Sequence, residues 1–432
     1  MNINKLQIIL IGGAVFLTLI VVLIFSGVLP GLKDNTQESA TLELWGFDDD
    51  RVWDQTLRAH KDENPKITVN YKRKTLENFE TELLNAIARG DSPDIFILPS
   101  EYLKKFEDKI SSAPPILITE REVEQQFVES AKQFLTPQKK VLGIPLYADP
   151  LVLYWNKDIF TRESIALPPK TWDEFLQISQ KITKKDNAGN ITVSGAALGR
   201  AKNIKNAPAI LTALFLQSGE KIINEENEVV LGESVRTGEV SLRPAESALR
   251  FFSEFADSGK TSHSWVSSLP EAEDLFLSGK LGMYIGFSSE YEQMRKKNPH
   301  TAIGMAHLPN LNSEKATYGS VFAPVVPLAS QNYTASWQFI KFLTSKEISK
   351  LFSDSQMSAS PRRDLFSSYQ SDSVRSVFAE SNLSLKSWPN PNPTKTNAIF
   401  SELMEDMARK IDTMRALLTK AANKIREINK TR

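Results

Sequence analysis

The sequence contains no cysteine among its 432 residues. This absence excludes disulfide bonds, a thiolate nucleophile and cysteine-ligated zinc sites. The 4 histidines are scattered without the spacing of metal ligands, so we predict no metal site. The 52 basic residues are balanced by 52 acidic ones, and no basic cluster offers the cationic footprint that nucleic-acid binding needs.

Sequence signatures of catalysis are also missing. There is no P-loop, no dinucleotide-binding fingerprint and no nucleophile elbow, so we predict a protein that is not an enzyme and that uses no cofactor. The enzyme alternative is a glycosidase with paired carboxylates, because sequence alone does not give the distance between two carboxylates.

The N-terminal part of the chain contains one uncharged apolar run, residues 8–29, which has about the length of a transmembrane helix. It is longer than the apolar core of a signal peptide, and Pro30-Gly31-Leu32-Lys33 offers no small-x-small cleavage site. We therefore predict a cytoplasmic tip and a single-pass membrane anchor over residues 1–33, rather than a cleaved signal. Residues 34–40 would form a tether, and the rest of the chain would lie on the extracytoplasmic side of the cell membrane.

From residue 41 onward, short apolar runs alternate with amphipathic segments. This pattern predicts the order strand, helix, strand, helix, strand over residues 41–47, 54–63, 67–71, 76–89 and 94–98. Such an order is typical of an α/β fold with a mostly parallel sheet, which binds ligands beyond the carboxyl ends of its strands. Towards the C-terminus, apolar residues at helical spacing predict one long helix over residues 397–430.

One carboxylate interrupts the apolar stretch Gly143–Phe160. Asp149 would bring an unpaired charge into an unbroken buried strand, which is energetically costly, and the next residue, Pro150, has no backbone donor. We therefore predict that the strand breaks at Asp149–Pro150 and that the carboxylate meets a polar partner.

Several short motifs, in this order, resemble family 1 extracellular solute-binding proteins, the maltose-binding-protein-like receptors of ABC importers. The motifs are Leu44-Trp45-Gly46, Gly90-Asp91-Ser92-Pro93-Asp94, Gly143-Ile144-Pro145 with Tyr154-Trp155-Asn156-Lys157-Asp158, Pro168–Phe175, Phe276–Met283, Tyr318-Gly319-Ser320, Trp337–Thr344 and Ser360-Pro361-Arg362-Arg363. The resemblance extends from about residue 41 to the end. Trp155 departs from the Tyr-Asn-Lys of the family, and the apparent anchor departs from its cleaved signal or lipidated cysteine.

The resemblance implies a two-lobed periplasmic-binding-protein fold of type II, with hinge closure around a ligand in the cleft. Residues 41–148 and 323–357 would form lobe one, and residues 149–322 and 358–432 would form lobe two. Asp149–Pro150 would be the first hinge, with the carboxylate facing ligand hydroxyls. The expected ligand is a mono- or oligosaccharide, the expected partners are ABC permease subunits, and the expected state is a monomer. A membrane-anchored sensor with the same fold and a binder of peptides or other small solutes are the alternatives.

A carbohydrate site needs aromatic rings for the C–H faces of the sugar, and carboxylates, amides or guanidinium groups for its hydroxyls. In lobe one and its hinge, the candidate ligand-binding residues are Trp45, Phe47, Asp48, Asp49, Ser100, Tyr102, Tyr147 and Asp149. In lobe two and the other crossings, they are Asn206, Phe287, Ser288, Tyr318, Gly319, Arg362 and Trp388. Each candidate also has a structural alternative: Trp45 in the core, helix capping for Asp48, Asp49, Ser100 and Asn206, and a Tyr147–Asp149 hydrogen bond that stiffens the hinge.

Overall fold

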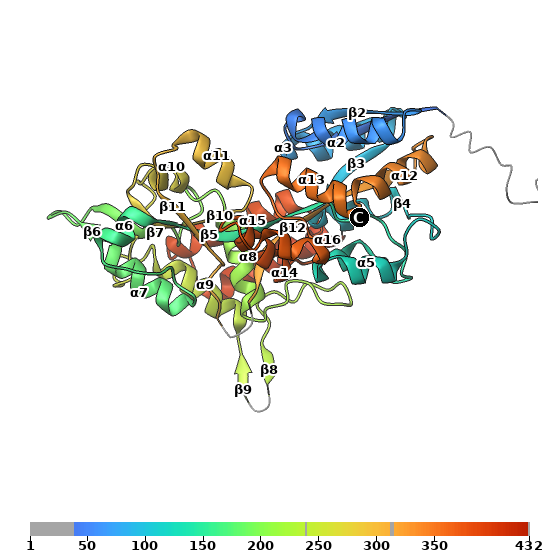
Figure 1. Cartoon of the computed structure of the whole chain (residues 1–432). Helices are drawn as coiled ribbons and strands as arrows, with labels where there is room; N and C mark the ends of the chain where they lie inside the picture. The colour runs from blue at the N-terminus through green and yellow to red at the C-terminus, as the bar shows by residue number, and fades with distance from the viewer. Residues whose placement is uncertain (1–38, 238–239, 312–314, 431–432) are drawn as a thin grey trace, which may run out of the picture.

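The computed structural model describes residues 39–237, 240–311 and 315–430, which form two lobes joined by shared strands (Figure 1). The predicted anchor and most of the predicted tether lie outside the described residues. Within those residues, no helix is long and apolar enough to cross a membrane.

Lobe one begins with the alternation of strands and helices that the sequence predicts. The elements are β1 (Ala40–Gly46), α2 (Asp50–Glu63), β2 (Ile67–Arg73), α3 (Leu76–Arg89) and β3 (Ile95–Pro99). β1 lies between β2 and β3 and is parallel to both, with Ala40 opposite Ile67 and Leu44 opposite Ile95. The carboxyl ends of these strands therefore lie at one edge of the sheet, where residues 47–49 follow β1.

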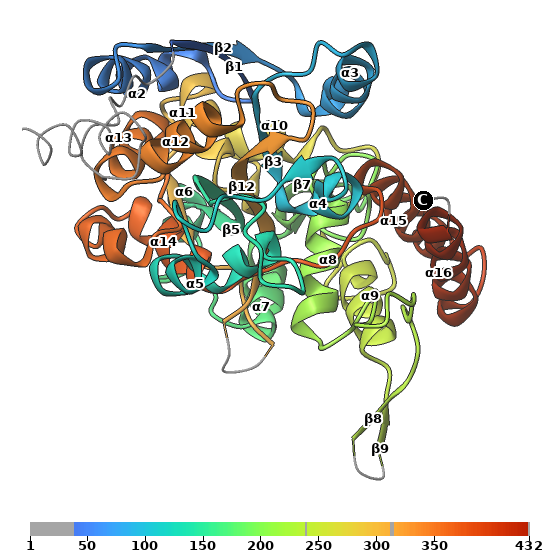
Figure 2. The same ribbon diagram turned by 90° about the vertical axis from the view of Figure 1, so that its right-hand side faces the viewer.

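One sheet runs through both lobes in the order β2-β1-β3-β12-β5-β10-β7-β6. The remaining strands of this path are β12 (Thr317–Pro327), β5 (Tyr147–Asn156), β10 (Leu281–Phe287), β7 (Ile191–Ala196) and β6 (Lys184–Lys185). Beside the path, β4 (Ile110–Ser111) and β13 (Leu385–Lys386) pair with β12, and β11 (Ile303–Ala306) pairs with β5. A hairpin of β8 (Val235–Thr237) and β9 (Val240–Leu242) projects from lobe two (Figure 2).

Helices cover the sheet in each lobe. In lobe one these are α4 (Leu103–Phe106), α5 (Glu120–Gln126), α12 (Tyr333–Leu343) and α13 (Lys346–Gln356), in addition to α2 and α3. In lobe two they are α6 (Lys157–Arg162), α7 (Trp172–Ile182), α8 (Ala207–Gln217), α9 (Pro244–Glu254), α10 (Ala272–Leu277), α11 (Glu290–Lys297), α14 (Arg375–Leu383), α15 (Pro393–Ala408) and α16 (Met414–Lys430). Short 3-10 segments cover Ser100–Tyr102, Glu129–Phe134 and Arg363–Tyr369.

The lobes have separate hydrophobic cores. Lobe two is packed around one large cluster that includes Tyr154, Trp265 and Phe400. Lobe one contains two clusters, one around Trp53 and the other around Phe79. Burial of these large side chains stabilises each lobe.

β5 is a continuous strand, so the predicted break at Asp149–Pro150 is wrong. The strand exchanges its neighbour at this point: residues 147–150 pair with β12, and residues 151–155 pair with β10. Pro150 lies where the partner strand changes, so its missing backbone N–H removes little of the hydrogen bonding between the strands. Its carbonyl still accepts a hydrogen bond from the backbone N–H of Ser288 at 2.9 Å.

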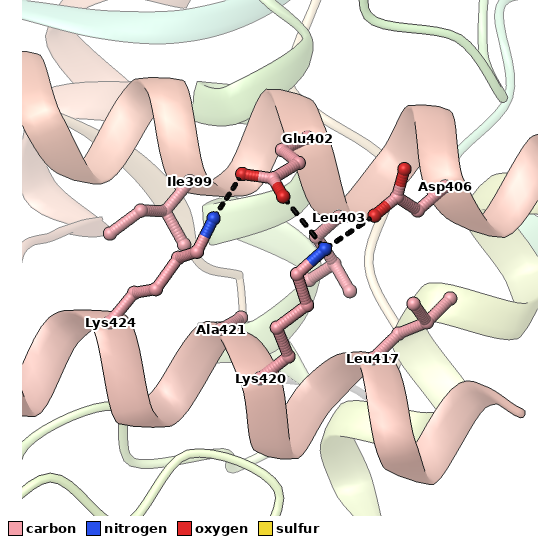
Figure 3. Close-up of a pocket in the computed structure, with 8 residues that line it drawn as sticks. All are labelled: Ile399, Glu402, Leu403, Asp406, Leu417, Lys420, Ala421 and Lys424. Carbon is pink, nitrogen blue, oxygen red and sulfur yellow. Dashed lines mark hydrogen bonds and ion pairs between the residues drawn. The ribbon is translucent and has the colours of Figure 1, made fainter. Parts of the chain in front are cut away.

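The prediction of one helix over residues 397–430 is also wrong, because α15 and α16 are two helices that pack side by side (Figure 3). The chain turns between them at Lys410, which has a φ of 56°, and the side chain of Ile411 is 63% exposed. The predicted apolar stripe is otherwise buried at Phe400, Leu403 and Ile425. Both helices pack against α9, and α15 also packs against α8.

Candidate ligand-binding site

A cavity of about 400 Å³ lies between the two lobes, within the usual range for small-molecule sites of roughly 300–1,000 Å³. It is bounded by the end of β1, the crossing strands, the C-terminus of α13 and the start of α11. The lining residues of lobe one are Phe47, Asp48, Asp49, Val52, Arg73, Leu76, Gln356 and Met357, and Ser358 directly follows them in the chain. The crossing strands contribute Tyr147, Ala148, Asp149 and Phe322, and lobe two contributes Ser288, Ser289, Glu292, Gln293 and Lys296.

The Asp149 carboxylate is held by three donors from the start of α11. Oδ1 accepts hydrogen bonds from Ser288 Oγ at 2.8 Å and from the Ser289 backbone N–H at 2.9 Å, and Oδ2 accepts one from Ser289 Oγ at 2.6 Å. Burial raises the pKa of Asp149 above its usual range, although these hydrogen bonds act in the opposite direction. The structure thus confirms the prediction that the Asp149 carboxylate meets polar partners, and it shows that these partners belong to the protein.

Asp48 is the acid of the cavity with an unused acceptor. Its Oδ1 accepts a hydrogen bond from Gln356 Nε2 at 2.5 Å, whereas Oδ2 is enclosed and has no hydrogen-bond partner among the described residues. Burial raises the pKa of Asp48 to about 6, against the lowering effect of the hydrogen bond from Gln356 and of the nearby Tyr147 hydroxyl. Because an enclosed acceptor without a donor is costly, this oxygen is suited to a donor that arrives with a ligand.

Asp49 has a different environment from its neighbour. It caps the N-terminus of α2, where its side chain accepts a hydrogen bond from the Arg51 backbone N–H, and its Oδ1 lies 2.8 Å from Arg51 Nε. These contacts with Arg51 lower the pKa of Asp49 to about 2. The predicted capping role is therefore present, in a side chain that also lines the cavity.

Aromatic rings form the apolar part of the cavity wall. The Tyr147 ring stacks on Phe322, with ring centroids 4.5 Å apart and planes 11° apart, and it also stacks on Phe352. Phe47 contacts Phe322 edge-on at 6.1 Å. Because Tyr147 and Phe322 are held by each other, Phe47, which is half-buried, has the most accessible aromatic surface of the three.

A further acid, half-buried, lies near the strands that cross between the lobes, outside the lining residues of the cavity. Glu101 follows β3, and its Oε2 lies 3.4 Å from the Tyr318 hydroxyl, which donates to it. Burial, together with the negative charge of Asp149, raises the pKa of Glu101 to about 7, although the hydrogen bond from Tyr318 acts in the opposite direction. The three acids Asp48, Glu101 and Asp149 give this region an excess of hydrogen-bond acceptors.

Among the candidate site residues, the structure brings Phe47, Asp48, Asp49, Tyr147, Asp149 and Ser288 together around the cavity. Trp45, Ser100 and Tyr102 lie elsewhere in lobe one. Trp45 and Tyr102 are buried in a core cluster, and Trp45 Nε1 donates to Glu43 at 2.8 Å. Ser100 Oγ accepts a hydrogen bond from the Val321 backbone N–H at 3.1 Å. Their contact with a ligand remains a prediction.

The other candidates also have structural partners outside the cavity lining, and their contact with a ligand likewise remains a prediction. Asn206 precedes α8 without capping it, and it donates to Glu290 at 2.8 Å. Gly319 lies against β5, where an added Cβ would stand 2.3 Å from the Asp149 carbonyl oxygen. The Phe287 carbonyl accepts a hydrogen bond from the Tyr154 hydroxyl, and the Tyr318 hydroxyl donates to Glu101. Arg362 donates to the Thr344 carbonyl and to Asp364. Trp388 is buried in the core of lobe two.

Several residues that line the cavity carry no recognisable motif in the sequence. Arg73 ends β2, Gln356 ends α13, and Glu292 and Lys296 lie on α11, without a motif that marks any of them. Ser289 is adjacent to the predicted Ser288, and its hydroxyl donates to Asp149. The only indication of this contact in the sequence was the expectation that the Asp149 carboxylate needs polar partners.

Two α/β lobes that share crossing strands and enclose a polar cavity define a protein of the solute-binding class. Residues 47–350 match the family model described as bacterial extracellular solute-binding protein, and the chain belongs to this family. This finding confirms the resemblance noted in the sequence.

Individual proteins agree with this assignment. A candidate binding protein of Brucella abortus (strain 2308) is 25% identical over 303 residues, covering 68% of this chain and 69% of the relative. The sugar-binding protein MalE from Xanthomonas citri superposes with a TM-score of 0.74 at 18% identity, covering 90% of this chain and 97% of that protein. An ABC substrate-binding protein of Listeria monocytogenes in complex with cycloalternan gives a TM-score of 0.71 at 18% identity, covering 90% and 99%. These likenesses confirm the two-lobed periplasmic-binding-protein fold.

Proposed function

We propose that this protein is the extracytoplasmic solute-binding protein of an ABC importer, and that it holds a mono- or oligosaccharide between its lobes for delivery to a membrane permease. The observation that carries the proposal is the interlobe cavity, whose lining combines the acceptors Asp48 and Asp149 with the aromatic side chain of Phe47. The solved structures of similar fold include a sugar-binding protein and an ABC substrate-binding protein in complex with cycloalternan, which supports both parts of the proposal.

In this proposal, a sugar hydroxyl supplies the donor that Asp48 Oδ2 lacks among the described residues. A hydroxyl bound to Asp48 Oδ2 gives this enclosed oxygen its missing partner, while Phe47 covers a C–H face of the sugar. Ser288, Gln293 and Lys296 approach from the other lobe. A ligand that contacts both lobes binds the closed form more tightly and so shifts the protein towards closure.

The hinge lies where β5 exchanges β12 for β10, at Asp149–Pro150. Residues 41–148 and 323–357 then move as lobe one, against residues 149–322 and 358–432 as lobe two. The protein acts as a monomer and carries out no catalysis. Its apolar N-terminal run, residues 8–29, anchors it in the membrane and keeps the lobes on the extracytoplasmic side.

A thermal unfolding screen of the full-length protein in detergent micelles tests the proposal, with the fluorescence of its 7 tryptophans as the signal. The panel contains mono- and oligosaccharides, amino acids, short peptides and polyamines. A ligand at a hundredfold its Kd adds roughly 2.7 kcal/mol of stability. We expect a rise in Tm with one class of sugar, lost in Asp48→Asn and kept in Asp54→Asn, an exposed acid on α2 outside the cavity. A rise with peptides or polyamines alone would contradict the carbohydrate assignment.

A further inference from the structure

Two neighbouring segments at one end of lobe one contain no charged residue, although 24% of the whole chain is charged. They are residues 111–119 and residues 328–340. The segments lie side by side, because β4 pairs with the end of β12, with Ser111 opposite Val326. The hydroxyl of Tyr333 also donates to the carbonyl of Ser112 at 2.8 Å. Together the two segments, which contain no charged side chain of their own, form a surface here called the lobe-one tip, and the Lys341 side chain at its border donates to the Leu117 carbonyl.

Large apolar side chains project from the lobe-one tip into solvent. Ile116 is 93% exposed, Leu328 is 65% exposed and Tyr333 is 37% exposed. Their backbones are fixed: Ile116 follows two prolines, and the Leu328 N–H donates to the Lys109 carbonyl at 2.9 Å. An isolated exposed apolar residue needs no explanation, but a group on adjoining uncharged segments indicates a surface that contacts an apolar partner.

The lobe-one tip lies at the end of the molecule where the described chain begins. β12 is antiparallel to β3, and β3 is parallel to β1, so the end of β12 and the start of β1 share one edge of the sheet (Figure 1). Residues 30–38 separate this edge from the apolar run that ends at residue 29. Fully extended, these residues span at most about 30 Å, so an anchored chain holds the tip close to the bilayer.

We propose that the lobe-one tip rests on the lipid bilayer, with Ile116, Leu328 and Tyr333 entering the headgroup region. This inference depends on the membrane anchor of the proposed function. Aliphatic side chains together with a tyrosine are suited to the headgroup region of a bilayer. The short connection to the anchor gives the lobe-one tip a high effective concentration at the membrane surface.

Apolar contact, rather than charge, holds the tip on the bilayer. The charged residues that flank the two segments balance: Lys109, Arg121 and Lys341 stand against Asp108, Glu120 and Glu122, with Lys109 2.7 Å from Asp108 and Lys341 4.0 Å from Glu122. Little positive charge is left for anionic lipids, so the contact is insensitive to salt and is made equally with zwitterionic lipids.

The position of the tip also orients the binding cavity. The cavity lies at the carboxyl end of β1, at residues 47–49, and the tip lies at its amino end. With the tip on the bilayer, the mouth of the cavity is held away from the lipid and open to solutes. Docking on a permease then requires release of the tip.

The absence of cysteine allows a direct test with single labels. The full-length protein is reconstituted into phosphatidylcholine vesicles with an environment-sensitive dye on Ile116→Cys or Leu328→Cys. Leu167→Cys in lobe two, where the native side chain is 68% exposed, is the matched control. We expect a blue shift and quenching by spin-labelled lipid at positions 116 and 328, unchanged in high salt, and neither effect at position 167.

A second variant separates lipid contact from a general effect of labelling. Ile116→Asp places a charge in the tip without disturbing the core, so it should reduce the quenching of a dye at position 328. Equal signals at all three positions, or quenching that Ile116→Asp leaves unchanged, would overturn the proposal. A chain that does not float with the vesicles would overturn the anchor and the tip contact, whereas the sugar screen in detergent would stand independently.

Discussion

Replacing Asp48 with asparagine tests the electrostatics of the cavity, because the substitution removes the charge and keeps the shape. The carboxylate accepts one hydrogen bond from Gln356 and has one enclosed oxygen without a partner. Burial raises its pKa from 3.8 to about 6. Each pKa unit corresponds to about 1.4 kcal/mol, so ionised Asp48 lowers the stability of the folded state by about 3 kcal/mol.

This destabilisation depends on pH in one direction. The pKa of Asp48 is higher in the folded state than in the unfolded state, so between about pH 4 and pH 6 the folded state binds more protons. Stability is therefore lost as the pH rises through this window. Asp48→Asn cannot ionise, so its free energy of unfolding should rise relative to the parent by about 2–3 kcal/mol between pH 4 and pH 7.5.

Urea denaturation at pH 4 and pH 7.5 measures this change, and Asp49→Asn is the matched control. Contacts with Arg51 lower the pKa of Asp49 to about 2, so its stabilisation is already complete near pH 4 and is lost only in stronger acid. We expect little pH trend for Asp49→Asn across the same window. A pH-independent difference between Asp48→Asn and the parent would refute the argument that burial raises the pKa of Asp48.

Three further substitutions probe the hinge and the periphery. Gly319→Ala places a Cβ 2.3 Å from the Asp149 carbonyl oxygen and should destabilise the fold by roughly 1–3 kcal/mol in thermal denaturation, whereas Gly259→Ala, at an open position, should be nearly neutral. Ser289→Ala removes a 2.6 Å hydrogen bond to a carboxylate and should cost about 1.5–3 kcal/mol, and an unchanged Tm would contradict this contact. Lys420→Ala breaks exposed, solvent-screened ion pairs with α15 (Figure 3), so the Tm and the ligand affinity should both stay nearly unchanged, which calorimetry would check.

The order of strands and helices in lobe one was predictable, because each element has its own apolar periodicity and its own turn residues. The start of α7 has a local signal of the same kind, because Thr171 caps this helix and its side chain accepts a hydrogen bond from the Glu174 backbone N–H. Such signals are local: they depend on residues within a few positions of one another.

The wrong or missing predictions concern features that depend on contacts between residues far apart in the sequence. β5 stays intact at Pro150 because two other strands take over its pairing, and no local pattern shows those partners. The split between α15 and α16 depends on a left-handed residue, Lys410, which has no special composition. In the site, Gln356 reaches Asp48 from 308 positions away in the sequence, so only the fold could place it there.

The central claim is that a sugar bound in the cavity closes the two lobes. Pulsed electron paramagnetic resonance between spin labels on Lys61→Cys in α2 and Lys181→Cys in α7 measures the interlobe distance in a chain with no other cysteine. Saturation with the sugar that raises the Tm should shorten this distance, and Asp48→Asn should require a higher sugar concentration for the same change. A distance that stays the same at saturation would contradict closure around the cavity.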